Sequence, residues 1–195
     1  MIASSYAQKV EEYAPEQERN KFISLIPKNA KILDAGCGSG RDCDYFVKHG
    51  FEVVGIDLSD KLLEIAKHRL PQVTFLKQDL RRLDFPDESF DGIWACATLH
   101  HLARSDMLTV LKKIFTLLKP NGILFVLVKE GVGEEDVKES LSSGLPRYYV
   151  YYSFDELKKL LEDAGFSNLD IYTWREEERR GGRSNLVWLT SFSKK

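Results

Sequence analysis

Short apolar segments alternate with amphipathic ones over most of this 195-residue chain, and no other feature of the sequence limits the fold as strongly. Five apolar runs have the length of strands, and each ends near a Gly, an Asp or another polar residue: 31–35, 52–57, 73–78, 90–97 and 122–128. The segments 41–49, 59–70 and 104–118 place apolar residues at helical spacing. Consecutive strand and helix units of this kind build a parallel sheet. We therefore predict an α/β sandwich.

The region after the fifth strand is expected to complete the sheet. Ser153 and Glu156 are spaced as a capping box, and Gly165 can end the helix that follows, which we expect at 154–164. Two later apolar segments, 169–174 and 185–192, can pair as a terminal hairpin. The sheet would then have seven strands.

Three other segments are expected to be connections. The sequence Lys-Pro-Asn-Gly at 119–122 should stop the preceding helix, and the charged residues 176–183 should join the strands of the terminal hairpin. Residues 129–152 are more numerous than the connections of compact domains usually are. We predict that they form an irregular lid or binding loop.

Composition fits one globular domain and argues against several classes of protein. Hydrophobic residues make up 43% of the chain and charged residues 30%, which is enough apolar material for a core. The 28 Lys and Arg residues against 30 Asp and Glu give a formal charge of −2, so no overall basic field favours DNA or an anionic membrane. Neither a signal-like segment nor a membrane-length apolar run is present, and a soluble cytoplasmic protein is expected. The three cysteines, Cys37, Cys43 and Cys96, show neither disulfide-framework nor zinc-site spacing, so no metal is predicted.

The most informative motif is a strand that leads into a glycine-rich turn and a helix, at residues 32–40. Its three glycines allow a sharp turn and close approach of a ligand. The dinucleotide fingerprint requires a third-glycine position that is Arg41 here, and the phosphate-loop pattern fails because no Gly-Lys-Ser/Thr follows. Asp34, just before the turn, would repel a pyrophosphate but would complement a cationic ligand. S-adenosylmethionine carries a sulfonium and an ammonium group and is such a ligand.

Two further acids follow later strands. Asp57 stands about twenty residues beyond the glycines, where a carboxylate can accept from both ribose hydroxyls of NAD or of S-adenosylmethionine. Asp79 ends the third predicted strand and can accept from an adenine amino group while Leu58 or Leu80 packs on the ring. Ligands of open α/β sheets bind at the carboxyl ends of the strands. The three acids are therefore expected to frame one crevice.

Five motifs lie along the chain: LDAGCGSGRD at 33–42, VGIDLS at 54–59, FPDESFD at 85–91, LHHL at 99–102 and LKPNGIL at 118–124. Together they resemble the class I S-adenosylmethionine-dependent methyltransferases, in particular small type 11-like members, many of which have no assigned substrate. The resemblance extends over residues 6–195. It implies a doubly wound, Rossmann-like α/β fold: a three-layer sandwich with strand order 3-2-1-4-5-7-6 and strand seven antiparallel. Residues 1–195 would be one domain, with 1–30 a helical cap and 129–152 an insertion over the acceptor.

The resemblance also implies which residues bind the cofactor and the acceptor. The expected cofactor residues are Asp34, Gly36, Cys37 and Gly38 at the methionine end, Asp57 and Leu58 at the ribose, Asp79 and Leu80 at the adenine, Ala95 near the donor, and Tyr6 and Tyr13 closing over it. Burial against the sheet is the alternative for the two tyrosines. The expected acceptor residues are Lys129, Arg147, Tyr149 and Tyr151, and the charged run at 175–183 adds Arg183.

Residues 147–183 contain two groups of side chains that could recognise an acceptor. Four tyrosines could form an aromatic cage or serve the packing of the lid itself: Tyr148, Tyr149, Tyr151 and Tyr152. Four arginines could clamp a carboxylate or phosphate, with a solvated hairpin tip as the alternative for the last three: Arg147, Arg179, Arg180 and Arg183.

Methyl transfer depends mainly on positioning and exclusion of water, because the donor is already electrophilic. An acceptor oxygen or nitrogen can also need a general base. The candidates are His101, then His100, and the tyrosines or acids of 129–152. A structural role for His101 at a helix start is the alternative.

Several acidic and thiol groups are interpreted as structural. Asp42, Asp87 and Asp91 occupy helix-start or turn positions, so no catalytic role is assigned to them. Cys96 is interpreted as a buried small residue, since the Pro that precedes the nucleophile of cytosine-C5 methyltransferases is replaced by Ala95. The Asn/Asp-Pro-Pro-aromatic segment of base N-methylation is absent from 94–98.

We therefore predict an S-adenosylmethionine-dependent methyltransferase that acts on an oxygen or nitrogen of a small molecule, as a monomer or homodimer, and releases S-adenosylhomocysteine. Three alternatives remain: a tRNA wobble-uridine methyltransferase acting with a partner, a non-catalytic S-adenosylmethionine-binding module, and an NAD-dependent oxidoreductase. Nucleic acid and membrane partners are not expected.

Overall fold

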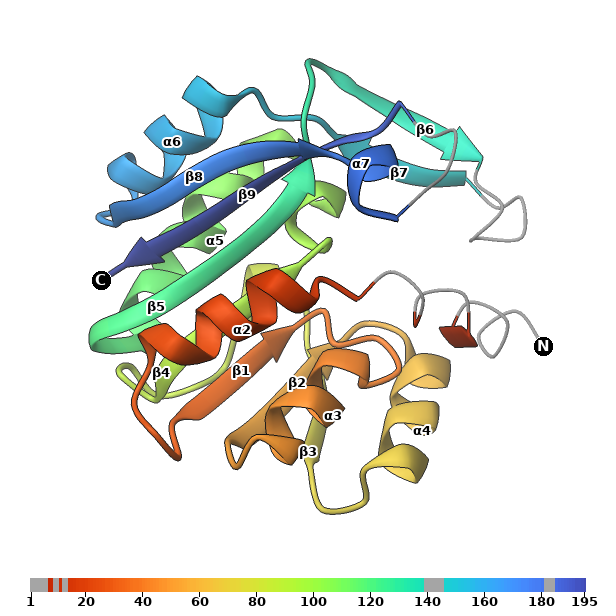
Figure 1. Cartoon of the computed structure of the whole chain (residues 1–195), viewed down its shortest axis with the longest axis vertical. Coiled ribbons are helices and arrows are strands. Elements are labelled where there is room, and N and C mark those ends of the chain that lie inside the picture. Colours follow the sequence, from red (N-terminus) through yellow and green to blue (C-terminus); the bar gives the residue numbers. More distant parts are fainter. Residues whose placement is uncertain (1–6, 9–10, 12–13, 139–145, 181–184) are drawn as a thin grey trace.

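The computed structural model describes residues 7–8, 11, 14–138, 146–180 and 185–195, with the side chain of Arg180 excepted. Helices and strands alternate along the first two thirds of this chain (Figure 1). In chain order the elements are α2 Glu16–Leu25, β1 Lys31–Ala35, α3 Arg41–Lys48, β2 Glu52–Asp57, α4 Asp60–Arg69, β3 Thr74–Lys77, η1 Leu80–Arg82, β4 Phe90–Cys96, η2 Leu99–His101, α5 Arg104–Leu117, β5 Leu118–Lys129, β6 Glu134–Lys138, β7 Pro146–Val150, α6 Phe154–Asp163, β8 Ser167–Arg175, α7 Glu176–Arg180 and β9 Val187–Lys194. No helix of the described residues is both long and apolar enough to cross a membrane.

Seven of the described strands form one sheet in the order β3-β2-β1-β4-β5-β9-β8. The strands β1 to β5 pair in parallel, whereas β9 runs antiparallel to both β5 and β8. The predicted strand order and the antiparallel last strand are therefore confirmed. In such a sheet the carboxyl ends of β1, β2, β4 and β5 lie at one edge.

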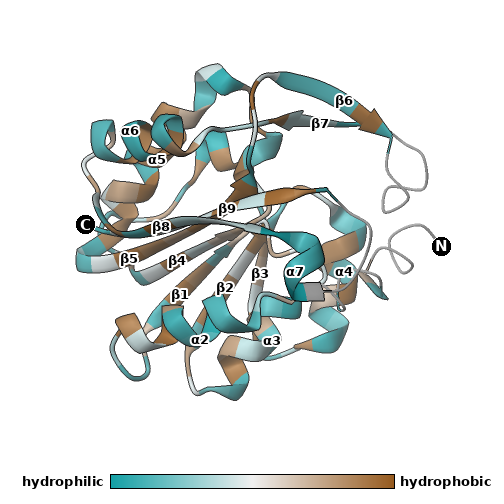
Figure 2. Cartoon of the chain, turned by 45° about the horizontal axis from the view of Figure 1, so that its top comes forward, coloured by the Kyte–Doolittle hydropathy of each residue, from teal (hydrophilic) through white to brown (hydrophobic). Residues whose placement is uncertain are grey.

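Helices cover both faces of the sheet, which gives the predicted three layers (Figure 2). On one face, Phe22 of α2 and Phe46 of α3 pack around Trp94 of β4, which also stacks on Phe125 with ring centroids 3.8 Å apart. On the other face, α5 and α6 bury apolar side chains such as Leu111 against the sheet. Strands buried on both faces read as continuous apolar runs, which explains the pattern that predicted them.

The predicted lid at 129–152 is not irregular throughout, and this expectation was wrong. Residues of β6 and β7 pair antiparallel, with Val137 opposite Arg147, and form a second sheet beyond the end of β5 (Figure 1). Glu130, before β6, and Tyr152, after β7, form an isolated bridge that brings the two ends of this segment together.

The predicted connector 176–183 differs from the structure, because it begins with the short helix α7, which continues directly from β8. The predicted stop of the helix before 119–122 is confirmed, since α5 ends at Leu117. Residues 119–122 already belong to β5, and the shift of register between Phe90 and Gly92 of β4 accommodates them. The capping box is confirmed for Ser153, whose Oγ accepts from the Glu156 amide at 3.3 Å, but the Glu156 carboxylate instead pairs with Arg104.

Candidate cofactor and acceptor site

The glycine-rich turn lies between β1 and α3 and is anchored to the neighbouring strand. The amides of Gly36 and Cys37 both donate to the carbonyl oxygen of Ile56, each at 2.8 Å. Gly36 has φ +82°, and a Cβ there would lie 2.2 Å from Thr98 Oγ1. Gly38, at φ +54°, has no heavy atom within 4 Å of the position of a Cβ. The backbone at Gly38 therefore faces open space, as close approach of a ligand requires.

Asp57 ends β2 and is fixed by two backbone amides. Its Oδ2 accepts from Gly38 at 2.9 Å and its Oδ1 from Ser59 at 2.8 Å. The next residue, Leu58, is an apolar side chain that is 57% exposed. A carboxylate oxygen has more than one acceptor site, so this group can still accept from a ligand hydroxyl. The arrangement brings Gly38, Asp57 and an exposed apolar surface together, as predicted.

The residues predicted to bind the adenine lie at the start of η1. Asp79 caps this short helix by accepting from the Arg81 amide at 2.9 Å, and its carboxylate also binds the Arg81 guanidinium at 2.5 Å. Leu80 packs into the core. Of the two leucines predicted to cover the adenine, Leu58 is thus the one with exposed surface in this structure.

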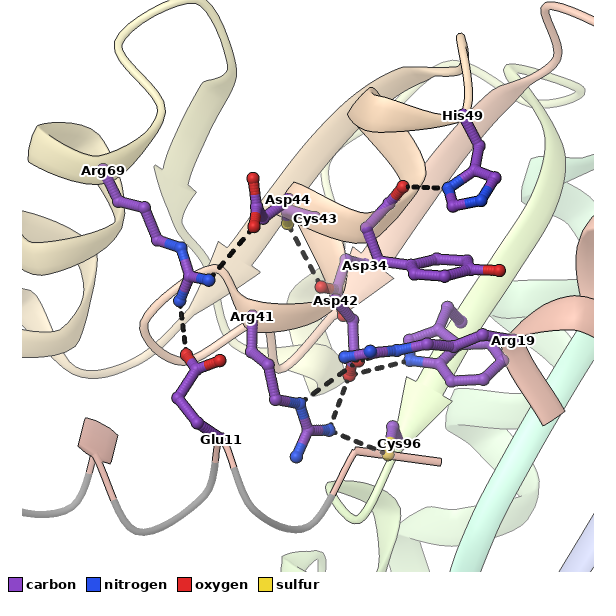
Figure 3. A network of polar contacts seen from close by, with 12 residues as sticks. Glu11, Arg19, Asp34, Arg41, Asp42, Cys43, Asp44, His49, Arg69 and Cys96 are labelled. Atoms are coloured by element: carbon purple, nitrogen blue, oxygen red, sulfur yellow. Dashed lines mark hydrogen bonds and ion pairs between the residues drawn. The ribbon is translucent and has the colours of Figure 1, made fainter. Parts of the chain in front are cut away.

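Asp34 is the most deeply buried of the predicted acids, at 2% exposure. Its carboxyl group accepts from Cys43 Sγ at 3.1 Å, in the interior behind the turn (Figure 3). Burial, with the negative charge of Asp42 as the second cause, raises the pKa of Asp34 to about 8. The group can therefore hold a proton near neutral pH, and a nearby cation would favour its ionisation.

Asp42 is not the ordinary helix-start acid that was predicted. It is 5% exposed and accepts from Arg19 Nε at 2.7 Å, Arg41 Nη2 at 2.8 Å and Trp94 Nε1 at 3.1 Å (Figure 3). Burial alone would raise its pKa, but the guanidinium groups of Arg41 and Arg19 hold the pKa well below its usual range. Arg19 and Trp94 come from α2 and β4, so no local pattern could have indicated this network.

The other two acids assigned structural roles are ion-paired. Asp91 accepts from the Lys31 amide at 2.8 Å and from Lys119 Nζ at 2.9 Å, whereas Asp87 pairs with Lys113. Both contacts hold connections at the amino-terminal edge of the sheet.

The residues at the end of β4 lie beside the turn. Ala95 is fully buried, and Cys96 Sγ accepts from Arg41 Nη2 at 3.6 Å. Burial raises the pKa of the Cys96 thiol to about 12, so the thiolate that a nucleophile needs is disfavoured. The raised pKa agrees with a structural role for Cys96, but the residue is partly exposed rather than buried as predicted. Cys37 of the turn is buried.

The two histidines follow β4 on η2, and their ring nitrogens have defined partners. His100 Nδ1 accepts from the Lys129 amide at 3.3 Å. His101 Nδ1 lies 2.8 Å from the Tyr148 carbonyl oxygen, and its Nε2 lies 2.6 Å from Arg147 Nη2. A carbonyl can only accept and a guanidinium can only donate, so His101 carries its proton on Nδ1. Its Nε2 lone pair then faces Arg147.

Tyr149 is the centre of a group that we name the histidine–tyrosine cluster: His100, His101, Lys129, Arg147 and Tyr149. The centroid of its ring lies 3.5 Å from Lys129 Nζ, 5.5 Å from Arg147 Cζ, and 4.6 and 5.1 Å from the rings of His101 and His100. The structure thus brings together both predicted base candidates and three of the predicted acceptor residues.

The remaining predicted residues are not part of this cluster. Tyr151 donates its hydroxyl to Glu135 Oε1 at 2.9 Å on the β6–β7 sheet. Tyr6, Tyr13 and Arg183 lie outside the described residues. Among the described residues, no three His, Cys, Asp or Glu side chains are grouped as a metal site.

Thr98 links the glycine-rich turn to the segment that carries the two histidines of the cluster. Thr98, whose side chain lies against Gly36, is followed directly by η2 with its two histidines. Lys129 ends β5, the neighbour of β4 in the sheet. The turn, Asp57 and the cluster therefore occupy the same edge of the sheet.

Comparison with known proteins identifies the family. A family profile described as a methyltransferase domain matches residues 32–122. The ubiquinone biosynthesis O-methyltransferase of Coxiella burnetii is 31% identical over 168 residues, which cover 78% of this chain and 71% of that protein. This chain belongs to the class I S-adenosylmethionine-dependent methyltransferase family. The Bacillus subtilis protein YqeM is 35% identical over 133 residues, but the match covers only 54% of its length.

Solved structures agree with this methyltransferase fold. The 1,6-didemethyltoxoflavin-N1-methyltransferase of Burkholderia thailandensis, solved with its substrate and S-adenosylhomocysteine, is 26% identical with a TM-score of 0.73; the match covers 98% of this chain and 84% of that one. An S-adenosylmethionine-dependent methyltransferase from Methanosarcina mazei is 20% identical with a TM-score of 0.77, over 93% of this chain and 97% of its own, and supports the fold alone.

S-adenosylmethionine, the cofactor of this methyltransferase family, fits the residues at the turn. Gly38 leaves open space, Asp57 offers a carboxylate and Leu58 an exposed apolar side chain. Ser39 Oγ is buried without a hydrogen-bond partner among the described residues, so the turn also retains an unsatisfied polar group.

Proposed function

We propose that this methyltransferase transfers a methyl group to an oxygen or nitrogen of a small molecule bound between the glycine-rich turn and the histidine–tyrosine cluster. The observation that carries the proposal is the contact of Thr98 with Gly36, which places the cluster next to the turn. The printed names of the Coxiella and Burkholderia relatives support small-molecule acceptors, through oxygen for the first and nitrogen N1 for the second.

The proposed cofactor site uses the predicted residues in the predicted order. Asp34, Gly36, Cys37 and Gly38 would hold the methionine end, Asp57 and Leu58 the ribose and ring, Asp79 and Leu80 the adenine, and Ala95 would lie near the donor. When bound, S-adenosylmethionine supplies a methyl group already activated for displacement. The chain's own contribution is then to position the acceptor and to exclude water.

The hydrogen bonds of the two histidines support a positioning role more than a basic one. Burial, and then the neighbouring groups His101, Lys129 and Arg147, lower the pKa of His100 well below its usual value. The neutral ring accepts through Nδ1, so its proton is on Nε2. His101 uses both nitrogens between Tyr148 and Arg147. Abstraction of a proton by either ring would first require one of these contacts to break.

We further propose that residues 1–195 act as one methyltransferase domain and that 129–152 covers the acceptor. The bridge between Glu130 and Tyr152 and the contact of His101 with Tyr148 support this placement of β6 and β7. A cytoplasmic location and a monomeric or homodimeric state stay predictions.

Calorimetric titration with S-adenosylhomocysteine and, in parallel, NADH tests the cofactor. We expect micromolar binding of S-adenosylhomocysteine and none of NADH. Binding of NADH alone would contradict the proposal and indicate hydride transfer.

Catalysis is tested separately by incubating the protein and S-adenosylmethionine with a panel of small metabolites. Formation of S-adenosylhomocysteine that depends on one acceptor class is the expected result. Cofactor binding with no turnover over a broad panel would instead indicate a non-catalytic binding module.

A further inference from the structure

Trp188, near the start of β9, carries a buried hydrogen-bond donor that the sheet does not satisfy. The residue is 8% exposed, and its Nε1 has no hydrogen-bond partner among the described residues. Nearly all buried polar groups of folded proteins are hydrogen-bonded, because a buried donor without an acceptor costs free energy. The indole N–H of Trp188 is therefore a group to which a bound molecule can supply the acceptor.

Trp174 shows how the same sheet satisfies a neighbouring indole. It lies opposite Trp188 on β8, and the two rings are 6.2 Å apart between centroids, with 25° between their planes. Trp174 Nε1 donates to Thr190 Oγ1 at 3.0 Å. Thr190 lies two residues beyond Trp188 on β9, so its hydroxyl is on the same face of the sheet. That hydroxyl serves Trp174, and the acceptor for Trp188 has to come from elsewhere.

His100 of η2 is a second N–H donor beside Trp188. It is 1% exposed, and the centroids of the two rings lie 6.1 Å apart. Its Nδ1 accepts from the Lys129 amide, so the ring carries its proton on Nε2. Within the described parts of the chain, no hydrogen bond from this Nε2 is present. Two neighbouring N–H groups from different elements thus have the same requirement.

Both donors lie at the edge of the sheet where the glycine-rich turn lies. Trp188 is the register partner of Lys129, at the carboxyl end of β5. His100 follows Thr98, whose side chain lies against Gly36 of the turn. A molecule bound between the turn and the histidine–tyrosine cluster is therefore placed next to these N–H groups.

We propose that His100 Nε2 and Trp188 Nε1 form a neutral donor pair that binds a carbonyl group of the methyl acceptor. A carbonyl oxygen only accepts and has two lone pairs, so it matches two groups that only donate. A methylene group at the same place would leave both N–H groups without an acceptor. The inference rests on the proposed function, because it names the chemical class of the same acceptor: a molecule with a ketone or amide carbonyl close to the methylated oxygen or nitrogen.

The test uses two probes of one bicyclic shape, 4-chromanone and chroman, which differ only in the carbonyl group. They are titrated into the protein, with and without saturating S-adenosylhomocysteine, and the indole N–H signals are followed by nuclear magnetic resonance. Trp94 and Trp174 are internal references, because their N–H groups already donate to Asp42 and Thr190. We expect 4-chromanone to move the Trp188 proton signal downfield and to leave both references in place, whereas chroman should not move it.

Affinity gives a second readout, the dissociation constant of chroman divided by that of 4-chromanone. Two hydrogen bonds should make this ratio about tenfold or more in the wild type. Trp188→Phe keeps a ring but loses the N–H, and His100→Asn keeps an acceptor for the Lys129 amide but loses Nε2. Each should lower the ratio about 3- to 10-fold. Trp174→Phe is the matched control, because it removes an indole N–H that already has a partner in the sheet, and it should leave the ratio unchanged.

Four results would overturn the donor pair: neither probe binds, the Trp188 signal does not respond to 4-chromanone, the ratio is unchanged in either variant, or Trp174→Phe lowers it as much as Trp188→Phe does. If Trp188→Phe fails to fold by circular dichroism, His100→Asn and the wild-type indole signals decide in its place. Binding of 4-chromanone that moves the Trp188 signal supports the pair even if S-adenosylhomocysteine does not bind. Acceptor-dependent turnover with an unchanged ratio in both variants would instead refute the pair and leave the proposed function standing.

Discussion

At the scale of single residues, Asp34 should make cofactor binding depend on pH. Its pKa of about 8 means that the unliganded protein holds a proton there at neutral pH. The ammonium group of the ligand, if bound beside Asp34, favours the ionised carboxylate, so binding should release this proton below pH 8. The dissociation constant of S-adenosylhomocysteine should then fall up to about tenfold per pH unit from pH 6 and level off near pH 8.

Calorimetry in two buffers of different ionisation enthalpy measures this proton release directly. Asp34→Asn is the control, since an amide has no proton to lose and any remaining pH dependence belongs to the ligand. If the affinity of the wild type is the same from pH 6 to 8 and no proton is released, ligand binding does not change the protonation of Asp34.

Asp42 gives a second prediction at this scale, on stability. Asp42→Asn leaves the buried guanidinium groups of Arg19 and Arg41 without their carboxylate. Loss of one partner from a buried ion pair costs about 3–5 kcal/mol, and we expect a decrease of that order in the free energy of unfolding measured in urea. Asp44→Asn, two residues along α3, removes the partly exposed pairs with Lys48 and Arg69. Its cost should stay below about 1 kcal/mol. Similar losses of unfolding free energy in both variants would mean that the buried Asp42 network stabilises the fold no more than the partly exposed ion pairs of Asp44 do.

At the scale of elements, the hydrogen bonds of His101 should hold β7 against η2. Its Nδ1 donates to the Tyr148 carbonyl and its Nε2 accepts from Arg147, so His101→Ala removes both contacts with this strand. We expect faster hydrogen–deuterium exchange in 146–150 and unchanged exchange in β1 and β4. His68→Ala is the control, because His68 is exposed and its Nδ1 bonds the Glu64 carbonyl oxygen of its own helix.

The pH profile of turnover separates this positioning role from a basic one. If His101 only positions β7, His101→Ala should lower kcat at every pH without shifting the pH profile. If His101 is a general base, the variant should instead lose the limb of the profile that the pKa of this base produces. Unchanged exchange in 146–150 together with a lost limb would favour the base.

Elements were predictable from the sequence where burial sets the pattern. Apolar runs bounded by Gly or Asp placed β1 and β2 at their observed limits, because strands buried on both faces leave few polar positions. The outer strands β6 and β7 were missed, since Glu134–Lys138 is an exposed, charged segment that lacks apolar alternation. Their pairing depends on contacts with distant parts of the chain, such as that of Arg104 with the carbonyl oxygens of Gly133 and Tyr151.

The same distinction applies to the site. Asp57 and Gly38 were found because motif spacing along the chain fixes their meeting at the strand ends. The network of Asp42 was missed because Arg19 and Trp94 lie 23 and 52 residues away from it along the chain. The buried Nε1 of Trp188 was missed because no local pattern indicates which groups surround that ring. Local sequence signals therefore indicated the residues of the proposed cofactor site, whereas tertiary contacts were needed to see how the histidine–tyrosine cluster is built.

At the scale of the whole molecule, the site is assembled from the ends of several strands of one sheet, so occupancy should stabilise the entire fold. S-adenosylhomocysteine at 100 times its dissociation constant adds about 2.7 kcal/mol, which for a domain of this size is an increase in Tm of about 5–10 °C. Asp57→Ala removes the carboxylate that accepts from Gly38 and Ser59 and should weaken binding by about 1–3 kcal/mol.

At that same ligand concentration the Asp57→Ala variant should lose about a third to nine-tenths of the increase. Asp60→Ala, at the exposed start of α4, should keep it, because Asp60 pairs with Lys77 on the outer side. Thermal melting of the three proteins with and without ligand measures the difference. If Asp57→Ala is stabilised as much as the wild type, the ligand binds elsewhere on the fold; if only the wild type and Asp60→Ala respond fully, the ligand binds at the strand ends beside Gly38.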